Sequence, residues 1–199
     1  MSPERLAHWL AGFTQRHGVP VPTPDPAGVR LDAPDGASAI LSDPWRPGPV
    51  DSPDELLAST MASRRFGLLL VRRAAHAIGV VEGTTLVRHR VDTHYVQGRT
   101  KAGGWSQQRY ARRRGNQAAA AYSSAADDAA EILVDAGLDA IVCGGDRRAV
   151  EQVMMDPRLA SLGSLRLDRL LNVPDPRLYV LADAVEAARA ITVRLNEQA

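Results

Sequence analysis

The sequence predicts a mixed α/β fold (α/β or α+β), with a mixed sheet flanked by helices and a small helix-and-hairpin extension at the N-terminal end. A continuous apolar run at residues 65–73, RFGLLLVRR, has the length of a strand and the composition of one buried on both faces. From about Gln107 to Ala136, apolar side chains recur every three or four residues, which predicts a long helix. Strand patterns precede this helix, and strand and helix patterns alternate after it.

Residues 1–55 are expected to form a helix, a β-hairpin and a proline-rich linker ahead of the main domain. Residues 3–16 carry apolar side chains along one helical face. Residues 29–43 read as two short strands around a Pro-Asp-Gly turn. Residues 44–54 hold four prolines, which is typical of a linker or loop. We therefore expect the main domain to span residues 56–199.

The main domain is expected to contain further strands and helices around its long helix. Residues 76–96 read as two strands joined by a tight turn. Residues 139–146 read as a short buried strand and a turn, after which Asp146 can cap a short helix. Residues 176–197 read as a C-terminal helix.

The composition excludes several classes of protein. Hydrophobic residues make up 45% of the chain and charged residues 24%, which is ordinary for globular proteins and excludes disorder. The apolar runs are too short to span a bilayer, and the N-terminus lacks the apolar region of a signal peptide, so we expect a cytoplasmic protein without membrane contact. Cys143 is the only cysteine, so no disulfide framework or cysteine-rich zinc site forms, and we expect it to be a small buried residue.

Positive charge is concentrated in one window of the chain. Between Thr93 and Ala126 there is no aspartate or glutamate, whereas six of the 24 basic residues fall there, among them Lys101, the only lysine. The window therefore carries six positive charges, although the formal charge of the whole chain is only +1. A local basic segment suits a phosphate backbone, while the near-neutral whole argues against a general nucleic-acid binder.

The basic window contains a glycine-rich segment with two glutamines, KAGGWSQQR at residues 101–109. Gly103 and Gly104 permit backbone conformations and close approaches that other residues cannot adopt. The amides of Gln107 and Gln108 donate and accept hydrogen bonds but cannot act as a base at neutral pH. A glutamine at a flexible reactive tip therefore orients a water molecule or stabilises charge on a carbonyl oxygen. Such a tip beside arginines suits insertion into a nucleoprotein site.

This stretch resembles the catalytic loop in the middle domain of the eukaryotic and archaeal class 1 release factors. In that loop a Gly-Gly-Gln tripeptide precedes a basic, aromatic-containing helix start, which RYARRR at residues 109–114 closely matches. After Gly103-Gly104, however, Trp105 stands where those factors have glutamine. The sequence is more similar to the Vms-like release factors of ribosome quality control, whose loop looks like Gly-x-x-Gln, here GWSQ at residues 104–107. It is similar to the actinobacterial members of that branch.

The resemblance implies a peptidyl-tRNA hydrolase that acts on stalled large ribosomal subunits and has an RNase H-like fold. Gln107 would position the water that attacks the ester in the peptidyl-transferase centre, with Gln108 as the alternative amide, and Gly103 and Gly104 would let the tip enter. The ribosome and the tRNA 2′-hydroxyl would supply the remaining catalysis, so the resemblance implies no metal and no cofactor. The implied partners are rRNA and peptidyl-tRNA rather than DNA, and we expect a monomer. The residues implied to contact RNA are Arg99, Lys101, Trp105, Arg109, Arg112 and Arg113.

A ribosome- or RNA-binding factor without chemistry is the alternative reading. A glutamine within reach of the Gly-Gly tip favours the enzyme, whereas Trp105 in the glutamine position favours the binding factor. The ring of Trp105 could stack on a base or pack on the domain.

Three histidines, His76, His89 and His94, form a weak pattern for a metal site. Because His89 shares the apolar face of its strand with Val87 and Val91, we expect it to be a core histidine.

Three carboxylates, Asp127, Asp128 and Glu131, could suggest a nuclease. Two-metal hydrolysis, however, needs acids that converge from separate elements, and these lie in one predicted helix. Since Asp127 and Glu131 share a helical face, we expect ordinary surface charge there.

Overall fold

The computed structural model describes residues 1–93 and 105–199, with side chains throughout except at residues 105–114 and 116. Across these described ranges, no helix combines the length and the apolar character needed to cross a membrane.

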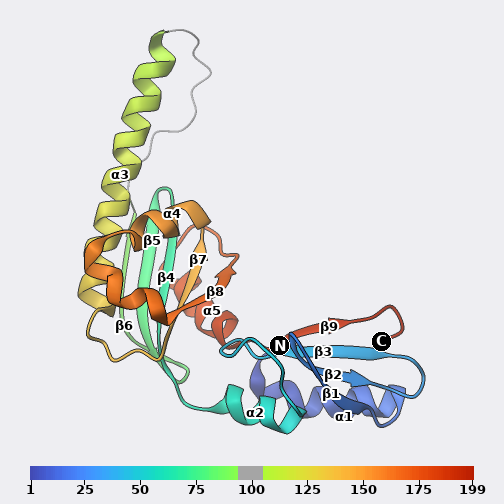
Figure 1. The fold of residues 1–199 in the computed structure, drawn as a ribbon. Coiled ribbons are helices and arrows are strands. Elements are labelled where there is room, and N and C mark those ends of the chain that lie inside the picture. Colours follow the sequence, from blue (N-terminus) through green and yellow to red (C-terminus); the bar gives the residue numbers. More distant parts are fainter. Residues whose placement is uncertain (94–104) are drawn as a thin grey trace. The chain divides into compact units, whose positions relative to one another are not determined.

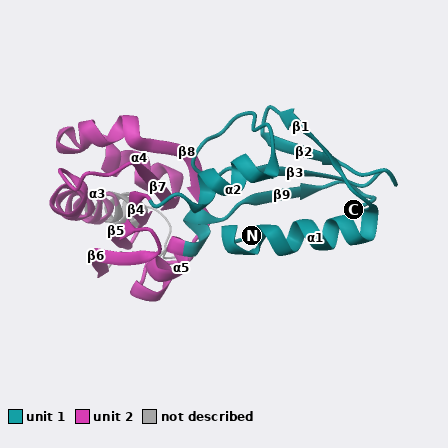
Figure 2. Ribbon diagram, turned by 90° about the horizontal axis from the view of Figure 1, so that it is seen from below, with its two compact units in different colours: residues 1–63, 186–199 teal, residues 64–185 magenta. Residues whose placement is uncertain are grey.

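The chain divides into two compact units, residues 1–63 with 186–199 and residues 64–185 (Figure 2). Each unit has its own sheet. Each also has its own cluster of buried apolar side chains, so the two can be considered separately.

The first unit contains a four-stranded antiparallel sheet in the order β1-β2-β3-β9 (Figure 1). The strands are β1 Val21–Asp25, β2 Gly28–Asp32, β3 Ser38–Ser42 and β9 Thr192–Leu195. Strands β2 and β3 form the hairpin predicted from residues 29–43, and β9 adds the end of the chain to the free side of β3.

Two helices complete the first unit. Helix α1, Leu6–His17, follows a 3-10 turn η1 at Pro3–Arg5, and its apolar face packs on alternate residues of the sheet. Helix α2, Pro53–Met61, begins after Ser52, whose hydroxyl accepts a hydrogen bond from a backbone N–H of the first turn.

The second unit contains a five-stranded mixed sheet in the order β6-β5-β4-β7-β8. The strands are β4 Arg65–Arg72, β5 Ala75–Glu82, β6 Thr85–Thr93, β7 Ala140–Gly145 and β8 Arg166–Leu171. Strands β4, β5 and β6 pair antiparallel, whereas β7 runs parallel to both β4 and β8. Strand β4 has fully buried residues from Phe66 to Val71, as its apolar run predicts.

One face of this sheet is covered by α3 (Trp105–Leu133), α4 (Arg147–Met154) and the 3-10 segment η2 (Pro157–Leu165). Asp146 caps α4 as predicted, because its carboxylate accepts from the backbone N–H of Arg148 at 2.9 Å. Gly145 precedes this cap with φ +97°, and a Cβ there would lie only 2.3 Å from the Val71 carbonyl oxygen, so glycine is required.

The fold class predicted from the sequence, a mixed α/β fold with helices flanking a mixed sheet, is confirmed. The C-terminal helix predicted over residues 176–197 is wrong beyond Arg189, because α5 spans Leu178–Arg189 and β9 follows it. The β-branched residues Thr192 and Val193 favour a strand there, and Val193 packs against the core of the first unit.

Candidate functional site

The residues singled out from the sequence lie at the start of α3 and just before it. The structure places Gln107 and Gln108 in the first turn of α3, which begins at Trp105, two residues earlier than the sequence pattern predicts. The side chains of Trp105, Gln107, Gln108, Arg109, Arg112 and Arg113 lie outside what the structure describes. Four further candidates precede the helix, outside the described residues: Arg99, Lys101, Gly103 and Gly104.

Helix α3 joins this N-terminal start to a half that is packed on the sheet. Within the part of α3 whose side chains are described, the first buried one is Ala121. At about 1.5 Å of rise per residue, the backbone of Gln107 lies roughly 20 Å further along the helix axis. Figure 1 shows this N-terminal half extending past the five-stranded sheet. The backbone N–H groups of this helix N-terminus thus lie in a stretch whose sequence is rich in arginine.

The packed half of α3 is tied to the sheet by an ion-pair network around the buried Asp128. Asp128 is 8% exposed, and its Oδ2 lies 2.8 Å from Nε2 of His76, which is 1% exposed on β5. Arg90 on β6 donates from Nη1 to Asp128 Oδ1 at 2.8 Å and to Glu131 Oε2 at 2.9 Å. Its Nη2 donates to Glu131 Oε1 at 3.0 Å, which makes the pair with Glu131 bidentate.

The charges in this network keep Asp128 ionised. Burial raises the pKa of the Asp128 carboxyl, but hydrogen bonds from His76 and Arg90, and their charges, hold that pKa below its ordinary value of 3.8. The hydrogen bond to Asp128 is also the main reason why the pKa of Arg90 is raised. Asp128 and Arg90 are therefore both charged at neutral pH, and Asp128 on α3 contacts partners on two strands.

A second arginine, Arg158 on η2, also binds a carboxylate of α3. Arg158 donates from Nη2 to Asp127 at 2.7 Å and to Asp156 at 2.7 Å, while its Nε donates to Asp156 at 2.9 Å. The hydrogen bonds with Arg158 lower the pKa of Asp156 to about 2. The three carboxylates of α3 are thus ion-pair partners of arginines rather than a set of acids that converge on one point.

One expectation from the sequence needs correction here. His89 is exposed on β6, because this edge strand faces solvent on the side that its valines occupy, and the buried histidine is His76. Asp127 and Glu131 are exposed, as expected, whereas Asp128 is buried, because it shares the packed face of α3 with Ala125 and Ile132. That spacing of three and four residues was the signal in the sequence that could have identified it.

Cys143 lies fully buried on β7, as expected, and burial raises its thiol pKa to about 11. Across the residues that the structure describes, no group of three histidine, cysteine or acidic side chains is arranged to hold a metal ion. His94 lies outside those residues.

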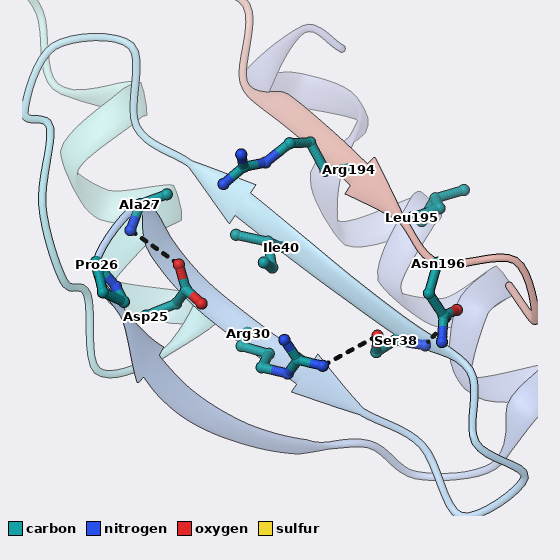
Figure 3. A pocket seen from close by; sticks show the side chains of 9 residues that line it. All are labelled: Asp25, Pro26, Ala27, Arg30, Ser38, Ile40, Arg194, Leu195 and Asn196. Carbon is teal, nitrogen blue, oxygen red and sulfur yellow. Dashed lines mark hydrogen bonds between the residues drawn. The ribbon is translucent and has the colours of Figure 1, made fainter.

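A hollow of about 620 Å³ lies on the open face of the sheet in the first unit (Figure 3). Arg30, Ile40 and Arg194 form one cross-strand row in its lining. Arg30 donates from Nε to Asp32 at 2.9 Å, and Asp25 also lines the hollow. Two arginines and one aspartate line the hollow, and Arg30 also pairs with Asp32, so the charge of the hollow indicates no class of ligand.

Comparison with known proteins identifies the family. No curated protein sequence matches the chain. Among solved structures, the archaeal translation termination factor aRF1 is similar with a TM-score of 0.49 and 16% identity, over 79% of this chain and 48% of that chain. An archaeal protein is similar with a TM-score of 0.44 and 16% identity, over 77% of this chain and 48% of that chain. The chain therefore matches about half the length of these two proteins, at 48% of each.

A family model described as Actinobacteria/chloroflexi VLRF1 release factor matches residues 64–194, which include all of the second unit and the glutamine-bearing start of α3. This match covers well over half of the 199 residues and confirms the resemblance drawn from the sequence. The chain belongs to the Actinobacteria/chloroflexi VLRF1 family of release factors.

Proposed function

We propose that this chain hydrolyses peptidyl-tRNA on stalled large ribosomal subunits and so releases the nascent peptide in ribosome quality control. The observation that supports this most is that the family match contains a Gly-Gly-Trp-Ser-Gln-Gln segment at the start of a basic helix, α3. A release factor must bring an activating group to an ester that lies inside the ribosome. A helix that extends past its own sheet can carry such a group.

In this proposal Gln107 positions the attacking water. The side-chain carbonyl oxygen of Gln107 accepts a hydrogen bond from the water, whose oxygen attacks the ester carbonyl carbon. The bond from that carbon to the ribose oxygen of the terminal adenosine then breaks, and the ribose oxygen receives a proton from the water. A backbone N–H of the first turn of α3 stabilises the developing oxyanion.

The amide of glutamine is neutral at pH 7, so it contributes geometry and hydrogen bonding rather than proton abstraction. Removal of one such group typically costs roughly 100- to 1000-fold in rate. The tRNA 2′-hydroxyl and the rRNA supply the rest of the chemistry. Gln108, the next residue in the same turn, is the alternative bearer of the amide.

The arginines near the start of α3 hold the RNA. Arg99, Lys101, Arg109, Arg112 and Arg113 neutralise phosphates of rRNA or of the tRNA end, and Trp105 stacks on a base. A specific observation favours a second candidate function, a non-catalytic factor that fills the same site: Trp105 stands where class 1 release factors carry glutamine.

The test is release of labelled peptide from peptidyl-tRNA bound to isolated bacterial large subunits. Gln107→Ala should bind the subunits as well as wild type but release peptide roughly 100-fold more slowly. Gln152→Ala, an exposed glutamine on α4, is the matched control and should release normally. If Gln108→Ala alone is inactive, the amide belongs to Gln108.

Changing Arg109, Arg112 and Arg113 together to alanine should abolish binding to the subunits and make the remaining binding less sensitive to salt. Wild-type protein that binds in an arginine-dependent manner and releases no peptide would refute the hydrolase and leave the binding factor.

A further inference from the structure

We infer that Arg90 is a positioning residue for the glutamine of α3: by gripping Asp128 and Glu131 it sets the direction in which the start of α3 extends. This inference rests on the proposed function, because it concerns where Gln107 is held. Arg90 itself touches no substrate.

Arg90 connects the two elements that flank residues 94–104, because it lies on β6 and its partners lie on α3. It is on β6, which ends at Thr93 and leads into residues 94–104, and its partners are on α3, which continues from them. Its guanidinium makes three hydrogen bonds to two carboxylates one helical turn apart, at 2.8, 2.9 and 3.0 Å. A planar fork that engages residues three apart on a helix opposes both rotation and sliding of that helix.

Apart from Tyr122, the apolar side chains that α3 packs on the core before Ile132 are small, so polar contacts add to the fixing of this part of the helix. On its buried face the side chains before Ile132 are mostly alanines: Ala121, Ala125, Ala126 and Ala129. A methyl group allows close approach but interdigitates little, so it resists sliding and rotation less than a long side chain does. The network of Arg90, Asp128, Glu131 and His76 supplies the directional contacts on that side of the helix.

The length of α3 amplifies any error at the network. At about 1.5 Å per residue, Gln107 lies roughly 31 Å along the helix from Asp128. A tilt of about 5° at Asp128 would therefore move the backbone of Gln107 by roughly 3 Å. A misplacement of about 1 Å at a reacting centre can cost on the order of 100-fold in rate.

The chain offers a matched control in Arg88. It lies two residues earlier on the same face of β6, and its Nη2 is 3.9 Å from Glu131, beyond hydrogen-bonding distance. Arg88 and Arg90 have similar exposure, 52% and 44% of the side chain. Replacing either arginine by alanine removes one positive charge. A difference in release rate between the two variants therefore reports the hydrogen-bond geometry of the Arg90 guanidinium and not the charge.

The first experiment measures release of labelled peptide from peptidyl-tRNA on isolated large subunits, over a range of protein concentrations. Arg90→Ala should lower the maximal release rate roughly 10- to 100-fold while the half-saturating concentration stays within about twofold. Arg90→Lys should recover only part of the rate, since one ammonium cannot reproduce the fork. Arg88→Ala should stay within about twofold of wild type. Equal rates for Arg90→Ala and Arg88→Ala, with both proteins folded by thermal melting, would overturn the inference.

The second experiment does not depend on release activity. Spin labels on Ser106→Cys and Val87→Cys report the distance between the start of α3 and β6, and the fully buried Cys143 will not take up label. Arg90→Ala should broaden or shift the distance distribution by several ångströms relative to wild type and to Arg88→Ala. An unchanged distribution overturns the positioning role even if the protein is a hydrolase. A changed distribution in a protein that releases nothing refutes the proposed function alone.

Discussion

Gly115 lies in the middle of α3, between its arginine-rich start and its packed half, and its replacement by alanine tests how that helix is held together. The residue is exposed, and a Cβ added there would meet no atom within 4 Å. Alanine therefore adds no clash and no new contact. The change acts only through the backbone, where glycine is less favourable than alanine in a helix interior by about 0.8–1.0 kcal/mol.

The expected gain of about 1 kcal/mol corresponds to a roughly fivefold smaller population of the locally open helix. The amides that report it are those of residues 116–119, whose hydrogen bonds reach carbonyls at residues 112–115. Their hydrogen exchange, followed by NMR, should slow roughly fivefold in Gly115→Ala. Amides of the first turn should change less, because that turn can open while residue 115 stays helical.

Gly12→Ala is the matched control. Gly12 is also interior to a helix, α1, and its added Cβ would lie 3.4 Å from the movable end of Arg16. This variant should stabilise the first unit and leave exchange at residues 116–119 unchanged. Equal exchange at those amides in wild type and Gly115→Ala would refute the helical reading of this part of α3. Because the Arg90 inference requires a straight, rigid helix, Gly115→Ala should also release peptide at least as fast as wild type.

Three further predictions concern the rest of the fold. The hydrogen bonds with Arg158 lower the pKa of Asp156 from 3.8 to about 2. The stability that this carboxylate contributes is therefore present above pH 3.8 and is lost as the pH falls from about 4 to 2. In urea unfolding, Asp156→Asn should lose less free energy of unfolding over that pH range than wild type. Because burial raises the thiol pKa of Cys143 to about 11, a thiol reagent at pH 8 should modify it only after unfolding, at the rate of opening. Gly79→Ala should lower the free energy of unfolding, measured in urea, by about 1–3 kcal/mol. The reason is that its Cβ would lie 2.5 Å from a methyl group of Leu86 and 3.3 Å from the carbonyl oxygen of Arg88. Gly163→Ala is the control and should not lower it, because a Cβ there meets no atom within 4 Å.

The parts of the structure that the sequence predicts well are those that depend on neighbours along the chain. The buried strand β4, the turn between β5 and β6 and the Asp146 cap of α4 each follow from a few consecutive residues. Periodicity and capping act over one or two turns, so a pattern there is sufficient. The position of Gln107 and Gln108 at the start of α3 follows for the same reason, although the helix begins two residues earlier than its pattern indicates.

The features that the sequence does not predict depend on residues far apart in the chain. Strand β9 pairs with β3, so that Leu195 lies opposite Ala39, and no local pattern links two such short segments. Strand β1 contains Pro22 and Pro24, which argue against a strand, and it is tolerated because it lies at an edge of the sheet. The burial of Asp128 likewise requires His76 and Arg90 to arrive from two other strands.

Under the proposed function, the protein would need no acid and base of its own, and the positions of Arg90 and Arg158 bear on how that could work. A neutral amide such as that of Gln107 would contribute to the rate only through where it is held, so the accuracy of its placement would be the main contribution of the protein. Gln107 lies in the first turn of a helix on which Asp128 is roughly 31 Å away, and ionic contacts there add to the packing of Tyr122, Ile132 and Leu133 in fixing the packed half. Arg90, on β6, binds the carboxylates of Asp128 and Glu131 on α3. Arg158, on η2, binds the carboxylate of Asp127. A lysine at either position would supply the same charge, but its ammonium group rotates freely and has no fixed planar arrangement of donors. The direction of the helix would then be less well defined, which is why the guanidinium geometry, and not the charge alone, is the property that matters here.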